Sequence, residues 1–547
     1  MRAPGDGDGI KIQLIAGTYV VLIGMSVEPD RIGELLGFTI ERTDHTEGER
    51  YFLSNSLLFE RNDAGTKSDY STAKNPVQAF SWGDYTAKPG HTYTYEVTAR
   101  YGTPAKLNDG PHAAATVTTE NPDDGTHGVY FNRGVAASAA YRRRFGDQNP
   151  ADVPNKEAYR WLSRGLEEAL VGFIGRAKDE RYSLRAAMYE FNFDPALEAF
   201  KIADQAGADV QIAYHKLGEV GDGNREALGD SGIKQLTIPR SKVSISHNKF
   251  VVLLKDGKPL EVWSGSTNVT EGGIYGHANV GHRIGDRKVA AAYLDYWTQI
   301  SINPSRPDIC AFNDPLPKFP KGRPKGGMTT VFSPRSNLDA LAWYVRLADT
   351  AKQGVFLTAA FGLKPEIKPV FDGDRDYLRY LLLDTEEGEV KALRRDPDNV
   401  VGAGYYKATG PYRTWIAKAL KRLNGHVDYV HTKLMIVDPL TEDPLVITGS
   451  ANWSKASCEK NDENMVVIRG DTRVADIYLT EFMRLFNHYR LRAKAKTPED
   501  KPPPGPRAPR AANQARLHLA PDSSWAEPFY VDNSPEAKER KMFAGLP

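Results

Sequence analysis

The sequence lacks several features that would each define a class of protein. Only two of its 547 residues are cysteines, Cys310 and Cys458, so a disulfide framework is not indicated. The formal net charge is only +1, which argues against a uniformly basic nucleic-acid coat but leaves room for a local basic groove. Hydrophobic residues make up 40% of the chain and charged residues 26%, which is the composition of an ordinary globular protein.

Long hydrophobic runs are also missing. The start, MRAPGDGDGIKIQ, does not have the basic residues followed by an apolar core that mark a secretory signal. The apolar stretch at 18–27 is too short to cross a bilayer, and no other stretch approaches the required length. We therefore expect a cytoplasmic protein.

The first part of the chain, residues 9–120, reads as short strands separated by turns. Pro89-Gly90 is a turn signal, and the strand after it has apolar or aromatic residues at alternate positions. This segment resembles a fibronectin type III module, with a tyrosine placed where a tyrosine corner could form. The resemblance implies a small all-β sandwich that serves as a structural or docking module for a protein partner. Its alternating residues are Tyr93, Tyr95, Val97 and Ala99.

From residue 127 the pattern changes to alternating helices and strands. Apolar residues at helical spacing predict helices over 161–178 and 196–205, and apolar runs predict strands over 183–191 and 209–214. Alternation of this kind predicts an α/β fold with a largely parallel sheet covered by helices on both faces.

A short set of polar residues occurs twice in this α/β region. His247-Asn248-Lys249 is followed by Gly265-Ser266-Thr267-Asn268, and His431-Thr432-Lys433 is followed by Gly449-Ser450-Ala451-Asn452. The asparagine comes 21 residues after the histidine in both copies (268 − 247 and 452 − 431), and the copies lie 184 residues apart (431 − 247). A register kept without gaps over such a span indicates a duplicated fold.

The repeat continues beyond the two motifs. Val289-Ala290 and Tyr293-Leu294 match Val474-Ala475 and Tyr478-Leu479 at a spacing of 185. We expect one half at 127–302 and the other at 328–490, joined by a Pro- and Lys-rich linker at 303–327. The second half is expected to hold a helix at 338–352, a strand at 354–360, a long insertion at 364–410 and the motif strand at 429–437. A basic, Pro-rich connector at 491–516 and a tail at 517–547 that docks on the core complete the division.

The repeated residues suit the chemistry of a phosphodiester. A histidine and a lysine two positions apart on a strand point to the same face, so two such strands could bring two imidazoles and two ammonium groups together. The lysines would hold the nonbridging oxygens and stabilise developing charge. One neutral histidine could attack phosphorus while the other protonates the leaving oxygen. This arrangement requires no metal or cofactor, and the sequence offers no clear metal-binding cluster.

The pattern H-x-K-x4-D followed by G-S-x-N, present twice, resembles the phospholipase D superfamily. The resemblance covers roughly 127–490 and implies a duplicated α/β/α sandwich with a pseudo-twofold active site and a covalent phosphohistidine. Catalytic roles carry over to His247, Lys249, Asn268, His431, Lys433 and Asn452, with Ser266 and Ser450 binding substrate. The family's aspartate maps to Asp438.

The two copies differ at two positions where the family has carboxylates. The counterpart of Asp438 in the first half is Leu254 (438 − 184), and Asp256 could replace it only if the loop rearranged. The second half supplies Glu463, the acidic residue that orients a histidine in this family, whereas the first half has Asn279. A carboxylate favours imidazolium and an amide does not, so the two histidines should differ in pKa. This difference does not show which histidine is the nucleophile; the resemblance to family members with two motifs in one chain favours His247.

Several other residues have a structural explanation that is simpler than a catalytic one. His215, His277 and His282 are interpreted as hydrogen-bonded structural histidines. Two short basic runs are interpreted as solvated faces, although either could bind phosphates. They are Tyr141-Arg142-Arg143-Arg144 and the set Lys318, Lys321, Arg323 and Lys325.

Three functions stay open at this point. The favoured one is a phosphodiesterase acting on nucleic acid, a metal-independent nuclease for DNA or RNA, because several basic clusters could follow a phosphate backbone. The second is a phospholipase or phosphatidyltransferase acting on membrane lipid, since single chains with both motifs commonly do so. The third is a degenerate member that serves as a binding or scaffold module.

Overall fold

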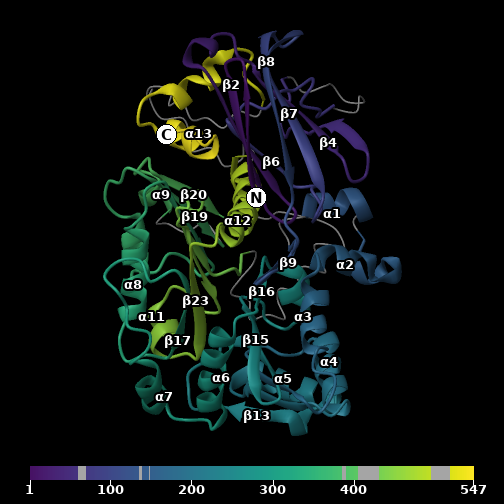
Figure 1. The fold of residues 1–547 in the computed structure, drawn as a ribbon, viewed down its shortest axis with the longest axis vertical. Helices are drawn as coiled ribbons and strands as arrows, with labels where there is room; N and C mark the ends of the chain where they lie inside the picture. The colour runs from purple at the N-terminus through teal and green to yellow at the C-terminus, as the bar shows by residue number, and fades with distance from the viewer. Residues whose placement is uncertain (60–68, 135–137, 147, 385–389, 404–429, 495–517) are drawn as a thin grey trace, which may run out of the picture.

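The computed structural model describes residues 1–59, 69–134, 138–146, 148–384, 390–403, 430–494 and 518–547. Two α/β halves lie side by side, and a β-sandwich lies at one end of the pair, at the top of Figure 1. Within these ranges, no helix combines the length and the hydropathy that a membrane span needs.

The N-terminal region is a sandwich of two antiparallel four-stranded sheets, which confirms the predicted all-β domain. Its first strand lies before residue 9, where the sequence placed the start. One sheet has the order β1 (Arg2–Gly7), β2 (Ile10–Ala16), β3 (Val21–Val27), β6 (Ser81–Asp84), and the other β5 (Glu49–Phe52), β4 (Gly37–Asp44), β7 (Thr92–Thr103), β8 (Lys106–Thr118).

Strand β7 shows why this region folds as a sandwich. Its alternate residues Tyr93, Tyr95, Val97 and Ala99 are completely buried, and the residues between them are more exposed. The Tyr93 hydroxyl accepts a hydrogen bond from the backbone N–H of Lys88 at 2.9 Å. That bond ties the start of β7 to the preceding loop in the manner of a tyrosine corner.

The two α/β halves have the same strand order, so the duplicated fold is confirmed. Strand for strand, each sheet repeats the other, with β9 (Asp123–Asp124) added at the edge of the first. The first sheet runs β13 (Thr237–Arg240), β12 (Asp209–His215), β11 (Tyr182–Met188), β14 (Lys249–Lys255), β15 (Lys258–Gly265), β16 (Val280–Ile284), β10 (His127–Phe131); the second runs β20 (Asn399–Ala403), β19 (Leu378–Leu383), β18 (Gly354–Ala359), β21 (Leu434–Val437), β22 (Leu445–Gly449), β23 (Glu463–Arg469), β17 (Gly327–Ser333).

The prediction of a largely parallel sheet was wrong, because both sheets are mixed. Only β11, β12 and β13, and their counterparts β18, β19 and β20, run parallel. The motif strands belong to antiparallel hairpins: β14 turns into β15 through Asp256 and Gly257, both at positive φ. A two-residue loop of this kind can join only antiparallel strands.

Three further predictions needed correction. The helix expected at 161–178 is broken into α2 (Glu157–Ser163) and α3 (Leu166–Ile174), because Arg164 and Gly165 adopt positive φ. The expected insertion at 364–410 contains β19 and β20, which belong to the sheet. The linker at 303–327 contains the helix α7 (Arg306–Asn313), which starts with a capping box at Ser305.

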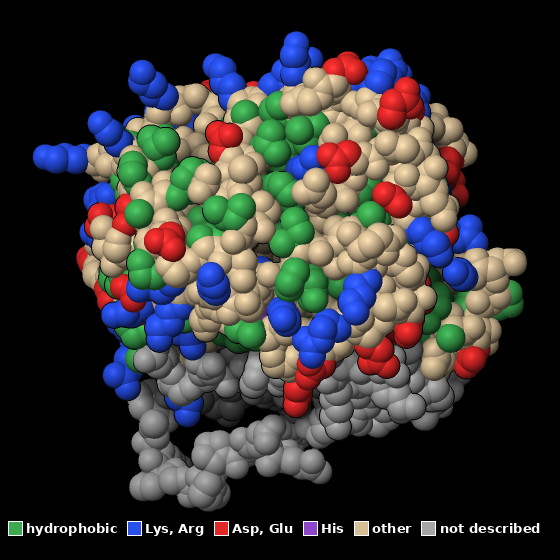
Figure 2. Space-filling model, turned by 90° about the horizontal axis from the view of Figure 1, so that it is seen from below, with side chains coloured by type: hydrophobic (Ala, Val, Ile, Leu, Met, Phe, Trp, Pro, Cys, Tyr) green, Lys and Arg blue, Asp and Glu red, His purple; other side chains and the backbone are tan. Residues whose placement is uncertain are grey.

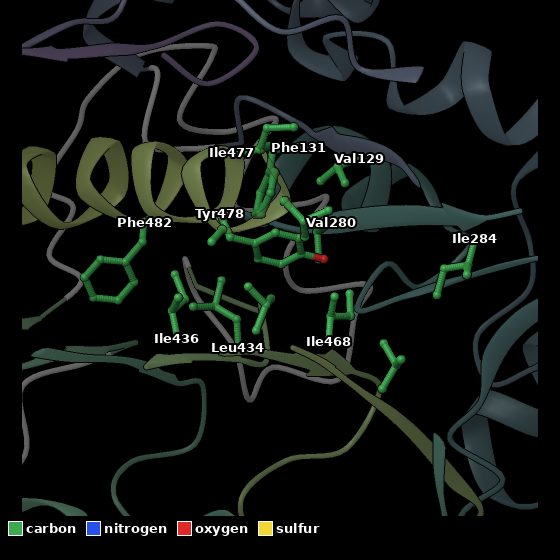
Figure 3. Packing of buried hydrophobic residues seen from close by; sticks show 14 of the residues in the cluster. Val129, Phe131, Val280, Ile284, Leu434, Ile436, Ile468, Ile477, Tyr478 and Phe482 are labelled. Atoms are coloured by element: carbon green, nitrogen blue, oxygen red, sulfur yellow. The ribbon is translucent and has the colours of Figure 1, made fainter. Parts of the chain in front are cut away.

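Helices α6 (Arg287–Ser301) and α12 (Thr472–Lys494) each follow the last motif strand of their half and carry the residues that repeat at a spacing of 185. Their apolar faces form the largest buried cluster, which draws residues from both sheets. In Figure 3, Tyr478 of α12 lies between Leu434 and Val280, Ile477 lies beside Phe131, and Phe482 lies at the left, on the side of Ile436. The outer faces are covered separately, the first sheet by α3, α4 (Asp194–Gln205) and α5 (Gly218–Asp230), and the second by α8 (Asp339–Ala348).

The C-terminal segment packs mainly on the N-terminal sandwich. Trp525 stacks on Phe80 with ring centroids 5.2 Å apart, and its indole N–H donates to the carbonyl of Leu35 at 2.9 Å. Helix α13 (Pro535–Phe543) also reaches the second half, where Lys538 pairs with Asp398 at 2.7 Å. The two ends of the described chain therefore help to hold the sandwich against the α/β halves. The connector expected at 491–516 lies outside the described residues, apart from the end of α12.

Candidate active site

Two short strand pairings between the halves bring the repeated motifs together. Ser246 pairs with Asp462, and Ala278 pairs with Val430, in parallel bridges that are related by the 184-residue repeat. The backbone N–H of His247 donates to the carbonyl of Asp462 at 2.9 Å, and that of His431 donates to the carbonyl of Ala278 at 3.1 Å. Each histidine is thus fixed by the backbone of the opposite half.

Each histidine is also oriented by a side chain of the opposite half. Nδ1 of His247 lies 2.8 Å from Oε2 of Glu463, and Nδ1 of His431 lies 3.0 Å from Oδ1 of Asn279. These contacts leave Nε2 of each ring as the atom available for chemistry. All four side chains are buried. The orienting carboxylate therefore serves the first-half histidine, although it lies in the second half.

Ser266 and Ser450, which were expected to bind substrate, form hydrogen bonds to the two orienting residues. The Ser266 hydroxyl donates to Oδ1 of Asn279 at 2.9 Å, and the Ser450 hydroxyl donates to Oε2 of Glu463 at 2.7 Å. Each also accepts a backbone N–H, from Val280 and Asn464 respectively. Both serines are completely buried.

The glycine before each serine is required by close packing. A Cβ at Gly265 would lie 2.2 Å from the carbonyl oxygen of Val280, and one at Gly449 would lie 2.2 Å from that of Asn464. Gly265 also has a φ of +141°, which a side chain disfavours. The glycines let the G-S-x-N turn lie directly against the strand that carries the orienting residue.

The two lysines lie in the same buried cluster. Nζ of Lys249 donates to the carbonyl of His247 at 2.6 Å, and Nζ of Lys433 donates to that of His431 at 2.7 Å. Burial lowers the pKa of Lys249 to about 7, against the opposing pull of Glu463 and Glu190. Burial, with the neighbouring Lys249 charge, holds the pKa of Lys433 well below its usual value. Two closely spaced buried cations of this kind favour an anionic ligand.

Burial also keeps both histidines neutral in the absence of a ligand. It lowers the pKa of His247 to about 4, although the Glu463 carboxylate acts in the opposite direction. The pKa of His431 is lowered well below its usual value by burial and by the charges of Lys433, His277 and Lys249. A neutral imidazole is the form that can act as a nucleophile.

The two motif asparagines differ in burial: Asn268 is buried, and Asn452 is half-buried. Asn268 donates from Nδ2 to Oε2 of Glu190 at 2.5 Å. The Oδ1 atoms of Asn268 and Asn452 are buried without a hydrogen-bond partner among the described residues. Buried polar atoms of this kind are usually satisfied by a ligand or by water.

Asp438 does not lie with this cluster, so its predicted catalytic role is corrected. Asp438 follows β21 at the end of the strand, whereas Lys433 precedes its start. Five extended residues separate their backbones by about 16 Å. Its carboxylate accepts backbone N–H groups of Lys352, Gln353 and Gly354 and pairs with Arg323 at 2.6 Å. Asp438 therefore holds a turn.

The first half has its own version of this turn. Strand β14 extends further than β21, so Asp256 reaches the position after the strand and adopts the same φ of +50° as Asp438. Its backbone N–H donates to the carbonyl of Arg181, as that of Asp438 donates to Gly354. Because Leu254 lies within β14, its mismatch with Asp438 reflects the different lengths of the two strands.

Four residues around the histidines were missed or read as purely structural in the sequence. The Tyr189 ring lies 4.8 Å from that of His247, and the His277 ring lies 5.6 Å from that of His431. His215 and Asp384 occupy matching places, where they accept the backbone N–H of Ser246 and Val430. Matching the ends of β12 and β19 would have found this last pair, but β19 was assigned to the insertion.

His282 lies outside the cluster. Its ring is hydrogen-bonded to His127 at 2.8 Å and to the Tyr478 hydroxyl at 3.0 Å. This fits the structural interpretation made for it.

The described residues contain one group whose side chains could surround a metal ion, and it lies in the sandwich. Asp44, Glu47 and His91 come together there. Lys88 already pairs with both carboxylate oxygens of Glu47 at 2.5 Å, and His91 is hydrogen-bonded to Asp44 at 3.0 Å. An ammonium group therefore already neutralises this cluster.

A comparison with protein families finds a match within the second half of the chain. Residues 375–486 match the family model described as cardiolipin synthase, PLD-like domain. This part of the chain is therefore similar to a phospholipase D-like domain. A curated relative, mitochondrial cardiolipin hydrolase of Xenopus laevis, is 31% identical over 109 residues, which are 20% of this chain and 47% of that protein. The chain thus matches less than half the length of this relative.

Solved structures with a similar arrangement are more distant. A phosphatidylserine synthase from Haemophilus influenzae Rd KW20 is 11% identical, with a TM-score of 0.41, covering 60% of this chain and 85% of its own. The phospholipase D family member Nuc from Salmonella typhimurium is 23% identical, with a TM-score of 0.21, covering 24% and 84%. At these scores neither similarity carries an argument about what the phospholipase D-like halves act on.

Proposed function

We propose that the chain is a metal-independent phosphodiesterase that acts through a covalent phosphohistidine at His247. The observation that carries this proposal is the crossed pairing of His247 with Glu463 and of His431 with Asn279 around two buried lysines. The carboxylate stabilises the positive charge that His247 acquires when it forms a bond to phosphorus. The Asn279 amide orients the His431 ring but adds no negative charge that would favour its protonated form.

The reaction has two steps. In the first, Nε2 of neutral His247 attacks phosphorus, an N–P bond forms, the bond to the leaving oxygen breaks, and protonated His431 gives that oxygen its proton. In the second, His431 takes a proton from water, the water oxygen attacks phosphorus, and the N–P bond breaks. Lys249 and Lys433 stabilise the nonbridging oxygens throughout. A bound phosphate anion would raise the pKa of the buried His431 and both lysines, which restores their charged forms when they are needed.

We propose nucleic acid as the substrate. Two sets of exposed basic residues support this choice: Arg142 and Arg143 on α1 (Ser138–Phe145), and Lys318, Lys321 and Lys325 before β17. Arg323 does not belong to the second set, because it is bound to Asp438. Figure 2 shows that basic, acidic and apolar side chains are interspersed on the face it displays. Binding of nucleic acid to this face would depend on local contacts rather than on a broad basic surface.

Membrane lipid is the second candidate substrate. The names of the matching family model and of the Xenopus laevis relative both refer to cardiolipin. The catalytic steps would be the same, since a phospholipid headgroup is also joined by a phosphodiester. The scaffold interpretation finds less support, because both histidines and both lysines are buried together and Asn268 is buried beside them.

Two finer proposals concern the rest of the chain. The tyrosine corner at Tyr93 supports a fibronectin type III-like sandwich that docks a protein partner. The buried free thiols of Cys310 and Cys458 are compatible with a reducing compartment such as the cytoplasm. The domain boundaries stay as given from the sequence, except that the sandwich includes β1 and that the linker contains α7.

A substrate panel tests the function. The purified chain is incubated in EDTA with plasmid DNA, single-stranded DNA, RNA, and phosphatidylcholine or cardiolipin vesicles, beside the His247→Ala and His431→Ala variants. Cleavage of nucleic acid that both variants lose supports the nuclease, and headgroup release moves the assignment to lipid. Turnover that requires added metal would contradict the histidine mechanism. Tight binding without any turnover would favour the scaffold.

A further inference from the structure

A second buried carboxylate lies against the catalytic cluster in addition to Glu463. Glu190 lies two residues after the end of β11, and it is 7% exposed. Its Oε2 accepts the amide of the catalytic Asn268 at 2.5 Å, and its carbonyl accepts the backbone N–H of Val269 at 3.1 Å. Both contacts tie it to the G-S-x-N turn of the first half.

The second half has no carboxylate at the matching place. Met188 pairs with Lys249, and Glu190 comes two residues later. In the second sheet Leu357 pairs with Met435, so the same register brings Ala359 opposite Lys433 and Phe361 two residues later. Glu190 is therefore a feature of one half-site and is not required by the repeated fold.

Glu190 balances the charge of the two lysines. Its charge interacts with both Lys249 and Lys433, which favour its ionised form, while burial disfavours that form and raises its pKa. Once a bound anion has restored the charged forms of both lysines, the buried cluster with Glu463 holds two ammonium groups and two carboxyl groups. An incoming phosphate group meets a site that is already close to neutral, so each further negative charge on the ligand adds repulsion.

Resting on the function proposed above, we propose that Glu190 is a specificity-determining residue that admits singly charged phosphodiesters and rejects doubly charged phosphomonoesters. Hydrolysis of a diester by the two-step reaction leaves a monoester. A monoester carries nearly two negative charges at neutral pH, because its second pKa is about 6. Glu190 therefore also promotes release of the product and limits inhibition by it.

Binding of two small ligands tests this proposal without any turnover. Dimethyl phosphate keeps one negative charge at every pH used, whereas monomethyl phosphate carries two at pH 8 and one at pH 5. Their affinities for the full chain and for Glu190→Gln are measured by calorimetry. Because both ligands require the same protonation of the lysines, the ratio of the two affinities isolates the effect of ligand charge.

We expect the wild-type chain to prefer dimethyl phosphate at pH 8. Glu190→Gln should reduce that preference about tenfold, the effect of removing one nearby charge at an intermediate dielectric. Glutamine can still accept from Asn268, so the turn should be retained. At pH 5 the preference should be small in both proteins, because the ligands then carry equal charge.

Two further variants control for changes in packing. Glu190→Asp keeps the charge and should keep the preference. Glu167→Gln alters a partly buried carboxylate that accepts from Tyr275, away from the lysines, and should leave the ratio unchanged. A ratio unmoved by Glu190→Gln overturns this inference alone. Failure of dimethyl phosphate to bind the wild-type chain overturns the phosphate site itself, and with it the proposed function.

Discussion

His247 and Glu463 lie 216 residues apart in the chain, yet Nδ1 of the imidazole is 2.8 Å from the carboxylate. The histidine belongs to the first half and the carboxylate to the second. Neither half alone therefore holds a complete catalytic pair. Glu463, which has no carboxylate counterpart in the first half, orients the first-half histidine. This contact between the halves is the physical basis for proposing His247 as the nucleophile.

That assignment predicts different defects for the two histidine variants. With a diester whose leaving group is an activated phenol, no proton is needed for departure, so His431→Ala should still form the phosphohistidine and then stall. His247→Ala should form none. Loss of the acid and base should slow steady-state turnover on the order of 10³-fold. Intact-protein mass spectrometry after quenching at high pH detects the adduct, and an adduct in His247→Ala would reverse the roles.

Substituting Glu463 or Asn279, which orient the two histidines, should shift the pH dependence of the reaction rate in a defined direction. The Glu463 carboxylate raises the pKa of His247 against the effect of burial. Glu463→Gln should lower that pKa further and reduce kcat on the order of 10²-fold, because the phosphorylated imidazole loses its counter-charge. Asn279→Glu should instead raise the pKa of His431. The pH profile of single-turnover rates measures both, and identical profiles for the two variants would contradict the crossed arrangement.

Much of this site could be predicted from the 184-residue repeat. The repeat identified both histidines, both lysines and both asparagines, and it marked Glu463 and Asn279 as unequal counterparts. It could not show that these two act on the opposite histidine, because a repeat spacing carries no information about which half a loop contacts. That information lies in the bridges Ser246–Asp462 and Ala278–Val430.

The residues and strands that the sequence misplaced or missed each have a local explanation. Asp438 was expected in the site because of its motif position, but five residues of extended strand carry it to the other end of β21. Strands β19 and β20 were overlooked because they lie in a stretch where the repeat spacing changes. Glu190 escaped notice because it has no counterpart in the second half.

Asp438 should matter for stability and not for catalysis. Asp438→Ala leaves the Arg323 guanidinium and three backbone N–H groups without their acceptor, so we expect a loss of about 3 kcal/mol in the free energy of unfolding. Asp256→Ala is the matched control at the equivalent turn. Urea denaturation measures the difference, and kcat at low temperature should stay within about twofold of the wild type. A large fall in kcat without loss of stability would restore the catalytic role.

Buried histidines should make the fold sensitive to acid. Burial lowers the pKa of His215 to about 4, from 6.5 in the unfolded chain. The unfolded state therefore binds the proton first as pH falls, and stability is lost between about pH 6.5 and 4. His215→Asn can still accept the N–H of Ser246 and should remove up to about 3 kcal/mol of this loss. Thermal unfolding at pH 7 and pH 4.5 tests this, and an equal drop in Tm for both proteins would contradict it.

The C-terminal segment should stabilise the sandwich through Trp525. This ring stacks on Phe80 and packs edge-on against Phe38, and its N–H reaches the carbonyl of Leu35. Trp525→Ala leaves a cavity and an unpaired buried carbonyl, so the cost should be about 3–5 kcal/mol. Val531→Ala, at a side chain that is 57% exposed in the same segment, should cost less than about 0.5 kcal/mol.

Two readouts locate the effect of Trp525→Ala. Amide hydrogen exchange should rise first in β3 and β6, which lie next to the segment, while the strands that carry His247 and His431 stay protected. Turnover should remain, since the tryptophan has no contact with the catalytic cluster. Faster exchange in β14 and β21 instead would mean that the sandwich and the catalytic halves unfold as one cooperative unit.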